Sequence, residues 1–258
     1  MKTIRLFGRE ICIGDRQALS AHLAETLATH RKSVFFCNVH MLMLSLEDQN
    51  LASAMASADI IFADGVPVAW LQRRLGARDA DVLRGYEAVE LVCRQAADTD
   101  AAIGFLGSTD VVLQKLTANL EQKHKGLSIN YIHSPGQINE DMDVDTSLVE
   151  QINAKQLYCL FIGLGCPKQE KWVSRYGPHL DCNLLAVGAA FDWLAGTTKK
   201  PPGWMERAGL AWLFRLFQSP GKMWHRYLIY NTKFMIMATK PLLWGRPKSE
   251  RRGGMNRK

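Results

Sequence analysis

The sequence predicts an α/β fold, in which a mostly parallel sheet is covered by helices on both faces, with a basic helical appendage at the C-terminus. Two observations support this prediction. Short apolar runs alternate with amphipathic stretches through residues 1–198, a pattern typical of parallel strands buried between helices. After residue 198 the composition changes, because tryptophans and basic residues accumulate there. We therefore expect a Rossmann-like body followed by a separate helical segment.

Six apolar runs are expected to form the strands, and they cover residues 34–37, 59–63, 101–106, 127–132, 157–164 and 183–187. Amphipathic patterns predict helices over residues 40–57, 67–75, 86–97, 109–123, 146–154 and 167–176. In open parallel sheets, ligands bind at the carboxyl ends of the strands. This rule directs attention to residues 38–40, 64–65 and 163–170.

Charge divides the chain into two parts. The net charge is +7, but residues 199–258 contain 14 Lys and Arg against two acids, while residues 1–198 contain 18 bases and 23 acids. A strongly basic segment of this kind suits either nucleic acid or an anionic membrane surface. We expect an α/β domain over residues 1–198, a membrane-associating helical appendage over 199–245 and a disordered basic tail over 246–258.

The appendage has the composition of a helix in a membrane interface. Residues 210–217 are almost wholly apolar, and residues 222–239 mix Trp, Tyr, Phe and Met with Lys and Arg. Ordinary core helices with a solvated basic end are the alternative. Because the bases flank apolar stretches rather than line a polar groove, nucleic-acid binding is the weaker interpretation. No apolar run approaches the roughly 18 to 20 residues that span a bilayer, and the first residues show no signal-peptide pattern.

Six cysteines are scattered through the chain without a C-x-x-C pair. Reduced and mostly buried thiols are therefore expected, and a zinc site is not. Four Asp-x-Asp pairs, which could hold a divalent cation, lie in polar stretches away from the predicted strand ends. We expect no required metal, so charge on a departing diphosphate would have to be met by helix amino termini and by Arg or Lys.

Asp64 is the first candidate for chemistry. It ends an apolar strand and precedes Gly65, although an Asp at this point can simply cap the following helix. Asn38 and His40 follow the neighbouring strand and could orient a sugar or tune the carboxylate. A purely structural histidine at position 40 remains an equal alternative.

The turn from strand to helix at residues 163–170 is the local pattern that most specifically indicates a ligand-binding site. Gly163 and Gly165 would let the backbone approach a ligand, and Pro167 suits the first helical position. Lys168 and Gln169 add donors at a helix amino terminus that attracts phosphate or sugar groups. The third glycine of a dinucleotide fingerprint is missing, which disfavours a nucleotide-dependent oxidoreductase.

Two further turns repeat this arrangement. One contains Gly107, and the other contains Gly188 and Asp192. Close approach of a ligand would explain the small residues, and tight packing between strand and helix would explain them nearly as well.

These motifs, in this order, resemble the WecG/TagA/CpsF family of bacterial glycosyltransferases (glycosyltransferase family 26). The resemblance rests on blocks at residues 38–40, 63–65, 104–107, 163–170, 188–192 and 209–228. The last block begins GLAWLFRL and is similar to the GLEWLYRL of the family tail. Each block is weak by itself, but their order and spacing together are specific.

The resemblance implies an inverting transfer, without metal or cofactor, from a UDP-sugar to a polyprenyl-diphosphate-linked saccharide. Such a protein would bind peripherally at the cytoplasmic face of the bacterial inner membrane and serve surface-polysaccharide or exopolysaccharide biosynthesis. Asp64 would be the general base, with Asn38 and Gln169 positioning substrate. Arg215 and Arg226 of the basic tail become candidates for the diphosphate.

Two departures from the family pattern affect the expected site. Cys37 stands where many members have Thr, and Arg84 sits directly beside a glycine instead of three residues before it. Arg84 is a candidate for the same role from a shifted position.

The family uses UDP-glucose, UDP-N-acetylmannosamine and its uronic acid, and a neutral hexose or N-acetylhexosamine is slightly favoured here. Homo-oligomerisation is compatible with the sequence, and the main alternative is a non-catalytic nucleic-acid-binding protein.

Overall fold

The computed structural model describes residues 1–29, 31–136, 143–218 and 220–243. Its centre is a six-stranded sheet in the order β4-β3-β8-β7-β5-β6, and every neighbouring pair is parallel. The strands are β3 (Ser33–Cys37), β4 (Ile60–Ala63), β5 (Ala102–Gly107), β6 (Ser128–His133), β7 (Cys159–Gly163) and β8 (Asn183–Ala186). The Rossmann-like parallel sheet predicted from the apolar runs is confirmed.

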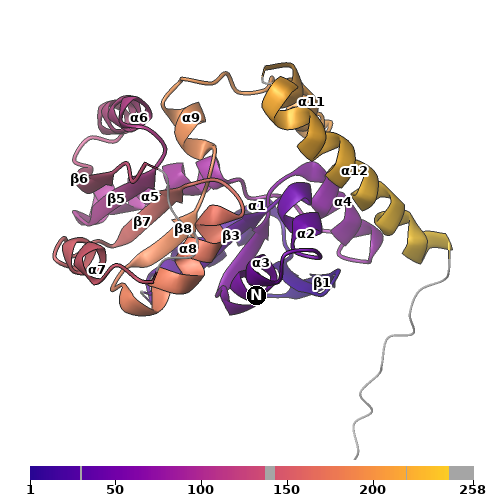
Figure 1. Cartoon of the computed structure of the whole chain (residues 1–258), viewed down its shortest axis with the longest axis horizontal. Helices are drawn as coiled ribbons and strands as arrows, with labels where there is room; N and C mark the ends of the chain where they lie inside the picture. Colours follow the sequence, from indigo (N-terminus) through magenta and orange to yellow (C-terminus); the bar gives the residue numbers. More distant parts are fainter. Residues whose placement is uncertain (30, 137–142, 219, 244–258) are drawn as a thin grey trace, which may run out of the picture.

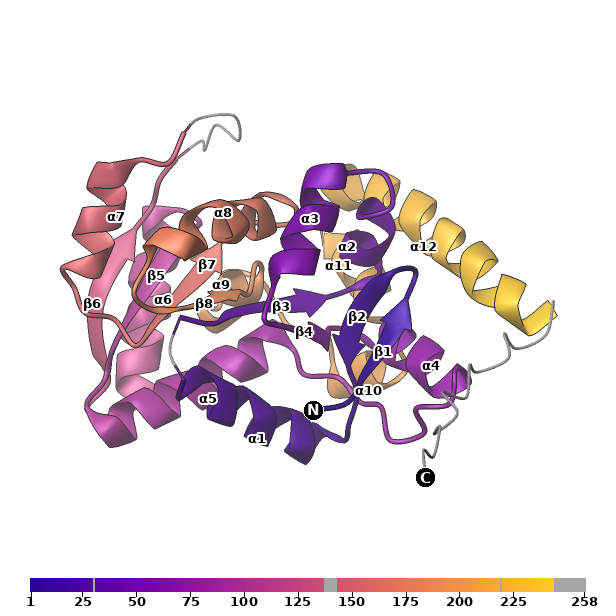
Figure 2. The same ribbon diagram turned by 90° about the horizontal axis from the view of Figure 1, so that it is seen from below.

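Helices cover both faces of this sheet (Figure 2). One layer contains α2 (Val39–Leu44), α3 (Gln49–Ser57), α7 (Thr146–Asn153) and α8 (Lys168–Tyr176), and the other contains α1 (Arg16–Leu27), α5 (Gly85–Thr99), α6 (Asp110–Lys123) and α9 (Ala190–Leu194). Along β7, Leu160 and Ile162 enter one core while Cys159 and Phe161 enter the other. This alternation follows from the two-residue period of a strand, and it explains why the run is apolar throughout.

The structure adds elements that were not predicted from the sequence. An antiparallel hairpin of β1 (Thr3–Leu6) and β2 (Arg9–Cys12) and the helix α1 precede the first predicted strand. The single helix expected over residues 40–57 is two helices, α2 and α3. The Asp48 carboxylate accepts a hydrogen bond from the Leu51 N–H at 3.0 Å and caps α3, which explains the break.

The C-terminal appendage is helical, as predicted. It contains α10 (Gly203–Arg207), α11 (Ala211–Gln218) and the long α12 (Pro220–Leu243), which runs beside α2 and the N-terminal hairpin (Figure 1). Phe234 of α12 is buried and meets the Phe7 ring edge-to-face at 6.5 Å. Lys233 of α12 also forms an ion pair with Glu47 of the body. The appendage is therefore packed onto the body through apolar contacts as well as charge.

The structure also bears on the predictions about cysteines, membrane-spanning helices and domain boundaries. All six cysteines lie within the described residues, and five of them are buried. None of the helices that the structure describes has both the length and the apolar character needed to cross a membrane. The domain boundary at residue 198 remains a prediction, and the tail over 246–258 lies outside the described residues.

Candidate active site

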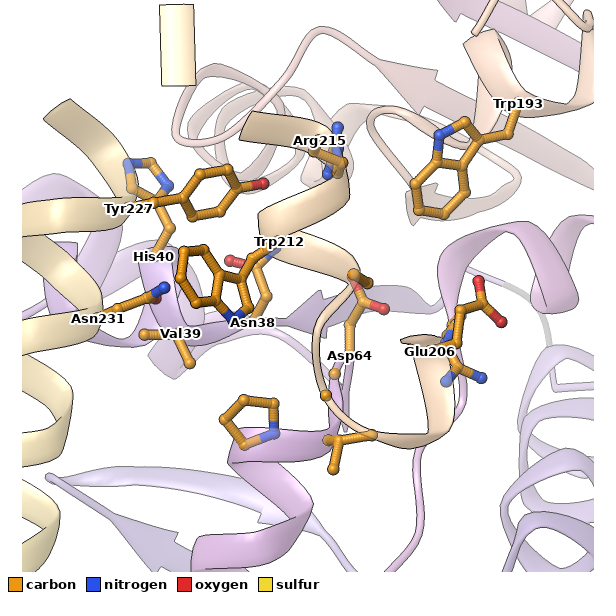
Figure 3. Close-up of a pocket in the computed structure, with 16 residues that line it drawn as sticks. Asn38, Val39, His40, Asp64, Trp193, Glu206, Trp212, Arg215, Tyr227 and Asn231 are labelled. Carbon is orange, nitrogen blue, oxygen red and sulfur yellow. The ribbon is translucent and has the colours of Figure 1, made fainter. Parts of the chain in front are cut away.

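A pocket lies where the carboxyl ends of β3 and β4 meet the appendage (Figure 3). The body contributes residues that follow these strands, together with Arg84 from the start of α5 and Trp193 from α9. The appendage contributes residues from α10, α11 and α12. The lining residues are Asn38, Val39, His40, Asp64, Gly65, Val66, Pro67, Arg84, Trp193, Glu206, Gly209, Ala211, Trp212, Arg215, Tyr227 and Asn231.

Asp64 occupies the centre of this pocket. It follows β4 directly, and its backbone N–H donates to the Cys37 carbonyl at 2.8 Å, which extends the pairing of β3 and β4 by one step. Gly65 takes φ +123°, a backbone conformation that a side chain would strain. The chain thus turns sharply after Asp64 into α4 (Val66–Arg74), which leaves the carboxylate at the edge of the sheet.

Asn38 lines the same pocket as Asp64. Its side-chain carbonyl accepts a hydrogen bond from the Met41 N–H at 3.2 Å and so caps α2. Its amide group donates to the Asp64 carboxylate.

His40 links the pocket to the appendage. It lines the pocket from α2, and its ring meets the Tyr230 ring of α12 edge-to-face at 4.8 Å. The structure therefore places His40 in the same pocket as Asp64 and also against α12.

Two arginines set the charge around Asp64. Burial raises the pKa of its carboxyl group to about 6, and the nearby guanidinium groups of Arg84 and Arg215 limit this rise by favouring the ionised form. Arg84 is the N-cap residue of α5, and its guanidinium lies 3.3 Å from the Glu87 carboxylate. Arg215 comes from α11 in the appendage. At neutral pH the group is a carboxylate whose pKa lies close enough to accept a proton during a reaction.

The turn after β7 lies at the same edge of the sheet, but its residues do not line the Asp64 pocket. Gln169 is 5% exposed, and its amide donates to the Ala186 carbonyl and to the Glu170 carboxylate. Its carbonyl accepts from the Gly165 N–H at 3.2 Å. The observed role of Gln169 is to tie this turn to β8, whereas Lys168 is exposed at the start of α8.

Two predicted glycines are explained by close packing. A Cβ on Gly107 would lie 2.5 Å from the Gly163 carbonyl carbon, and one on Gly163 would lie 2.4 Å from the Phe191 ring. Gly188 packs beside the Gln169 amide, and Asp192 accepts hydrogen bonds from the Thr197 and Thr198 backbone. Substrate contacts from these turns, including Pro167, remain predictions.

The structure thus brings Asn38, His40, Asp64, Arg84 and Arg215 together in one pocket. Arg226 lies in α12, but its side chain is outside the described part of the structure. Sequence reasoning missed the other pocket residues of the appendage and α9, namely Trp193, Glu206, Trp212, Tyr227 and Asn231. One signal was present for Glu206, since it is one of only two acids in a strongly basic segment.

Fold and site together define a class of protein: an α/β fold with an acid–base carboxylate in a cationic pocket at the carboxyl edge of a parallel sheet. Residues 4–248 match the sequence model of the glycosyl transferase WecG/TagA/CpsF family. The chain belongs to this family, and the resemblance inferred from its motifs is confirmed.

The chain is also similar to curated relatives. A protein of Bacillus spizizenii is 24% identical over 242 residues, which cover 90% of this chain and 91% of the relative. A Bacillus subtilis protein is 25% identical over 74% of this chain and 73% of its own length. A Staphylococcus aureus protein is 23% identical over 73% of this chain and 72% of its own length. All three bear the name N-acetylglucosaminyldiphosphoundecaprenol N-acetyl-beta-D-mannosaminyltransferase.

Proposed function

We propose that this protein transfers a sugar, with inversion, from a UDP-sugar to a saccharide carried on a polyprenyl diphosphate, and that Asp64 is the general base. The observation that supports this most directly is the position of Asp64, held by Asn38 at the sheet edge between two arginines. The family and the names of the relatives support transfer of a glycosyl group to a lipid-linked acceptor.

The proposed step uses one base and one cationic site. The acceptor hydroxyl oxygen attacks the anomeric carbon of the donor, and its proton passes to the Asp64 carboxylate. The bond between the anomeric carbon and the diphosphate oxygen breaks, and UDP leaves with the electron pair. Attack opposite the leaving group inverts the anomeric centre. A positioned carboxylate contributes about 10²- to 10⁴-fold in such a step.

Charge on the diphosphate groups is met by protein cations in this proposal. Arg84 and Arg215 line the pocket, and Arg226 remains a sequence-based candidate. Guanidinium groups suit phosphate oxygens because they offer paired donors in a fixed geometry. We expect the reaction to need no metal or other cofactor, in line with the absence of a strand-end Asp-x-Asp pair from the sequence.

The substrates are proposed only as classes. The relatives are named for an N-acetylglucosaminyl-diphosphoundecaprenol acceptor and an N-acetylmannosaminyl group. We propose a hexose or N-acetylhexosamine donor for this chain and a role in bacterial surface polysaccharide or exopolysaccharide synthesis.

A membrane surface is the proposed location of the acceptor. The described appendage exposes several large apolar side chains, namely Trp204, Phe217, Trp224, Leu228, Ile229, Met235 and Ile236. Together with its excess of bases, this supports peripheral binding to anionic lipid. We place the protein at the cytoplasmic face of the inner membrane, where nucleotide sugars are available.

The test is an Asp64→Asn variant assayed for UDP release against a panel of UDP-sugars with a synthetic polyprenyl-diphosphate-linked sugar. Asn keeps the shape of the side chain but cannot accept the proton, so turnover should fall by at least about 10²-fold. The variant should melt at or above the wild-type temperature at pH 7.5, because it no longer buries a charge.

Asp15→Asn is the matched control. Asp15 is exposed and caps α1 through the Ala18 N–H, a role that Asn fills equally well. This control should keep full activity. Substantial turnover in a folded Asp64→Asn protein would overturn the role assigned to Asp64. If the wild-type protein releases UDP with none of the donor and acceptor pairs tested, the proposed function is wrong.

A further inference from the structure

An aromatic pair in the body holds two cations that belong to the C-terminal segment. The Trp193 and Tyr86 rings meet edge-to-face with centroids 5.5 Å apart. The Arg215 guanidinium carbon lies 5.2 Å from the centroid of the Trp193 ring, and the Lys200 ammonium lies 4.0 Å from that of Tyr86. Figure 3 shows Trp193 projecting from α9 toward the pocket, with Arg215 on the facing side.

Trp193 of the body contacts the Arg215 head group. Within the described residues, no carboxylate lies within ion-pair distance of the Arg215 guanidinium. The Trp193 indole N–H is buried and has no hydrogen-bond acceptor in the described structure. The ring face, rather than the polar edge, therefore makes the contact that matters at this position.

We propose that Trp193 is a positioning residue, which holds Arg215 of the appendage over the pocket beside Asp64 through a cation–π contact. This proposal rests on the proposed transferase function and extends it to a residue that touches neither the proton nor the anomeric carbon. The stack orders a long side chain before substrate arrives, so less conformational entropy is lost when the guanidinium binds a diphosphate.

The titratable and charged groups near Asp64 come from several elements. Arg84 is the N-cap of α5 and Glu87 lies in its first turn, while Arg215 belongs to α11, Glu206 to α10 and His40 to α2. Only Arg215 is held by Trp193. Loss of the stack should therefore remove one cation from the vicinity of Asp64 and leave Arg84 in place, which raises the pKa of Asp64.

The experiment compares Trp193→Leu and Trp193→Phe in the full-length protein. Leu removes the ring face, and kcat should fall about 5- to 30-fold, the range expected for a cation–π contact. Phe keeps a ring and should stay within about 3-fold of wild type. The acidic limb of kcat/KM should move to higher pH in Trp193→Leu only.

Trp70→Leu is the matched control. Trp70 lies in α4, is half-buried like Trp193, and carries Arg74 over its ring at 5.4 Å, but it does not line the pocket. This variant removes a similar contact elsewhere on the body and should leave kcat and the pH profile unchanged.

A double-mutant cycle with Arg215→Ala separates positioning from direct contact with the substrate. If Trp193 acts through Arg215, Trp193→Leu should cost less than about 2-fold in the Arg215→Ala background. If Trp193 is instead a platform on which a sugar ring stacks, the loss persists in that background and appears as a raised KM. The second result would overturn the proposal.

A measurement independent of turnover distinguishes this proposal from the proposed function. In wild-type protein the indole ring current should shift the NMR signals of the Arg215 side chain upfield, with assignment by Arg215→Lys. The signals should return to ordinary positions in Trp193→Leu and stay shifted in Trp70→Leu. Identical Arg215 signals in wild type and Trp193→Leu would overturn the positioning role even if transfer is demonstrated.

Discussion

Asp64 and Asn38 lie together because the register of two strands brings them together. Cys37 pairs with Ala63 at the end of β3 and β4, so the next residue of each strand arrives at the same point of the sheet edge. Asn38 then divides its amide between the cap of α2 and the Asp64 carboxylate. Both residues were predictable, since each follows an apolar strand. Their interaction depends on the pairing and register of β3 and β4, which the sequence alone does not give.

The buried position of Asp64 leads to a pH prediction. Its pKa is raised to about 6, and the proposed base must be ionised to accept a proton. The carboxylate form is lost as the pH falls through that value. Below pH 6, kcat/KM for UDP release should therefore fall about tenfold per pH unit. Initial rates between pH 5 and 8 would check this, and a flat profile across that range would contradict it.

Gln169 shows why residues with good sequence signals can still be hard to interpret. A polar side chain at a helix amino terminus predicted a ligand contact, yet its amide bridges the β7 turn and β8. A sequence cannot distinguish a donor that faces a ligand from one that satisfies a buried backbone group. A buried polar side chain requires such partners in either case.

At the scale of elements, burial decided which parts of the fold could be predicted. Five of the six sheet strands are almost wholly buried and read as mainly apolar runs, whereas the edge strand β6 is partly exposed and more polar. In contrast, β1 and β2 are four residues each and are half polar. Helix α1 did carry a signal, because Leu19, Leu23 and Leu27 recur every four residues and are all buried.

The exposed face of α12 gives a prediction about membranes. Leu228 and Ile236 are 64% and 55% exposed. Replacing both with Ser should weaken co-sedimentation with anionic liposomes by about tenfold or more, since two large apolar groups no longer enter lipid.

Val111→Ser provides the control for this experiment. Val111 is 60% exposed but belongs to α6 on the body. Its replacement should leave liposome binding unchanged. Unaltered partition of the Leu228/Ile236 variant, or a protein that binds DNA in preference to liposomes, would contradict the membrane assignment.

At the scale of the whole molecule, the pocket is assembled across the seam between body and appendage. Trp212, Tyr227 and Asn231 face strand-end residues that precede them by more than 140 positions in the chain. No local pattern could join these groups, because only the packing of α12 along α2 brings them into reach. The body half of the site was therefore predicted in outline, whereas the appendage half was predicted only as a source of arginines.

Removal of residues 199–258 should therefore abolish transfer. The truncated body keeps Asp64 and the strand-end turns, so it should still bind UDP in a calorimetric titration. It loses Arg215 and the buried Phe234, and its melting temperature should fall because the face beneath α12 becomes exposed. A shorter deletion of residues 246–258 keeps every described pocket residue and is the control. Full turnover by the longer truncation would show that the appendage is dispensable for chemistry.

The uneven charge of the chain has a further consequence for how the molecule reaches a surface. Residues 1–198 carry 18 bases and 23 acids, whereas residues 199–258 carry 14 bases and two acids. The protein is thus an electric dipole. Near an anionic membrane surface the molecule experiences a torque, which turns its basic part toward the membrane before contact. Encounters with the membrane in the binding orientation therefore become more frequent than they would be without this orientation. The effect disappears as added salt shortens the Debye length.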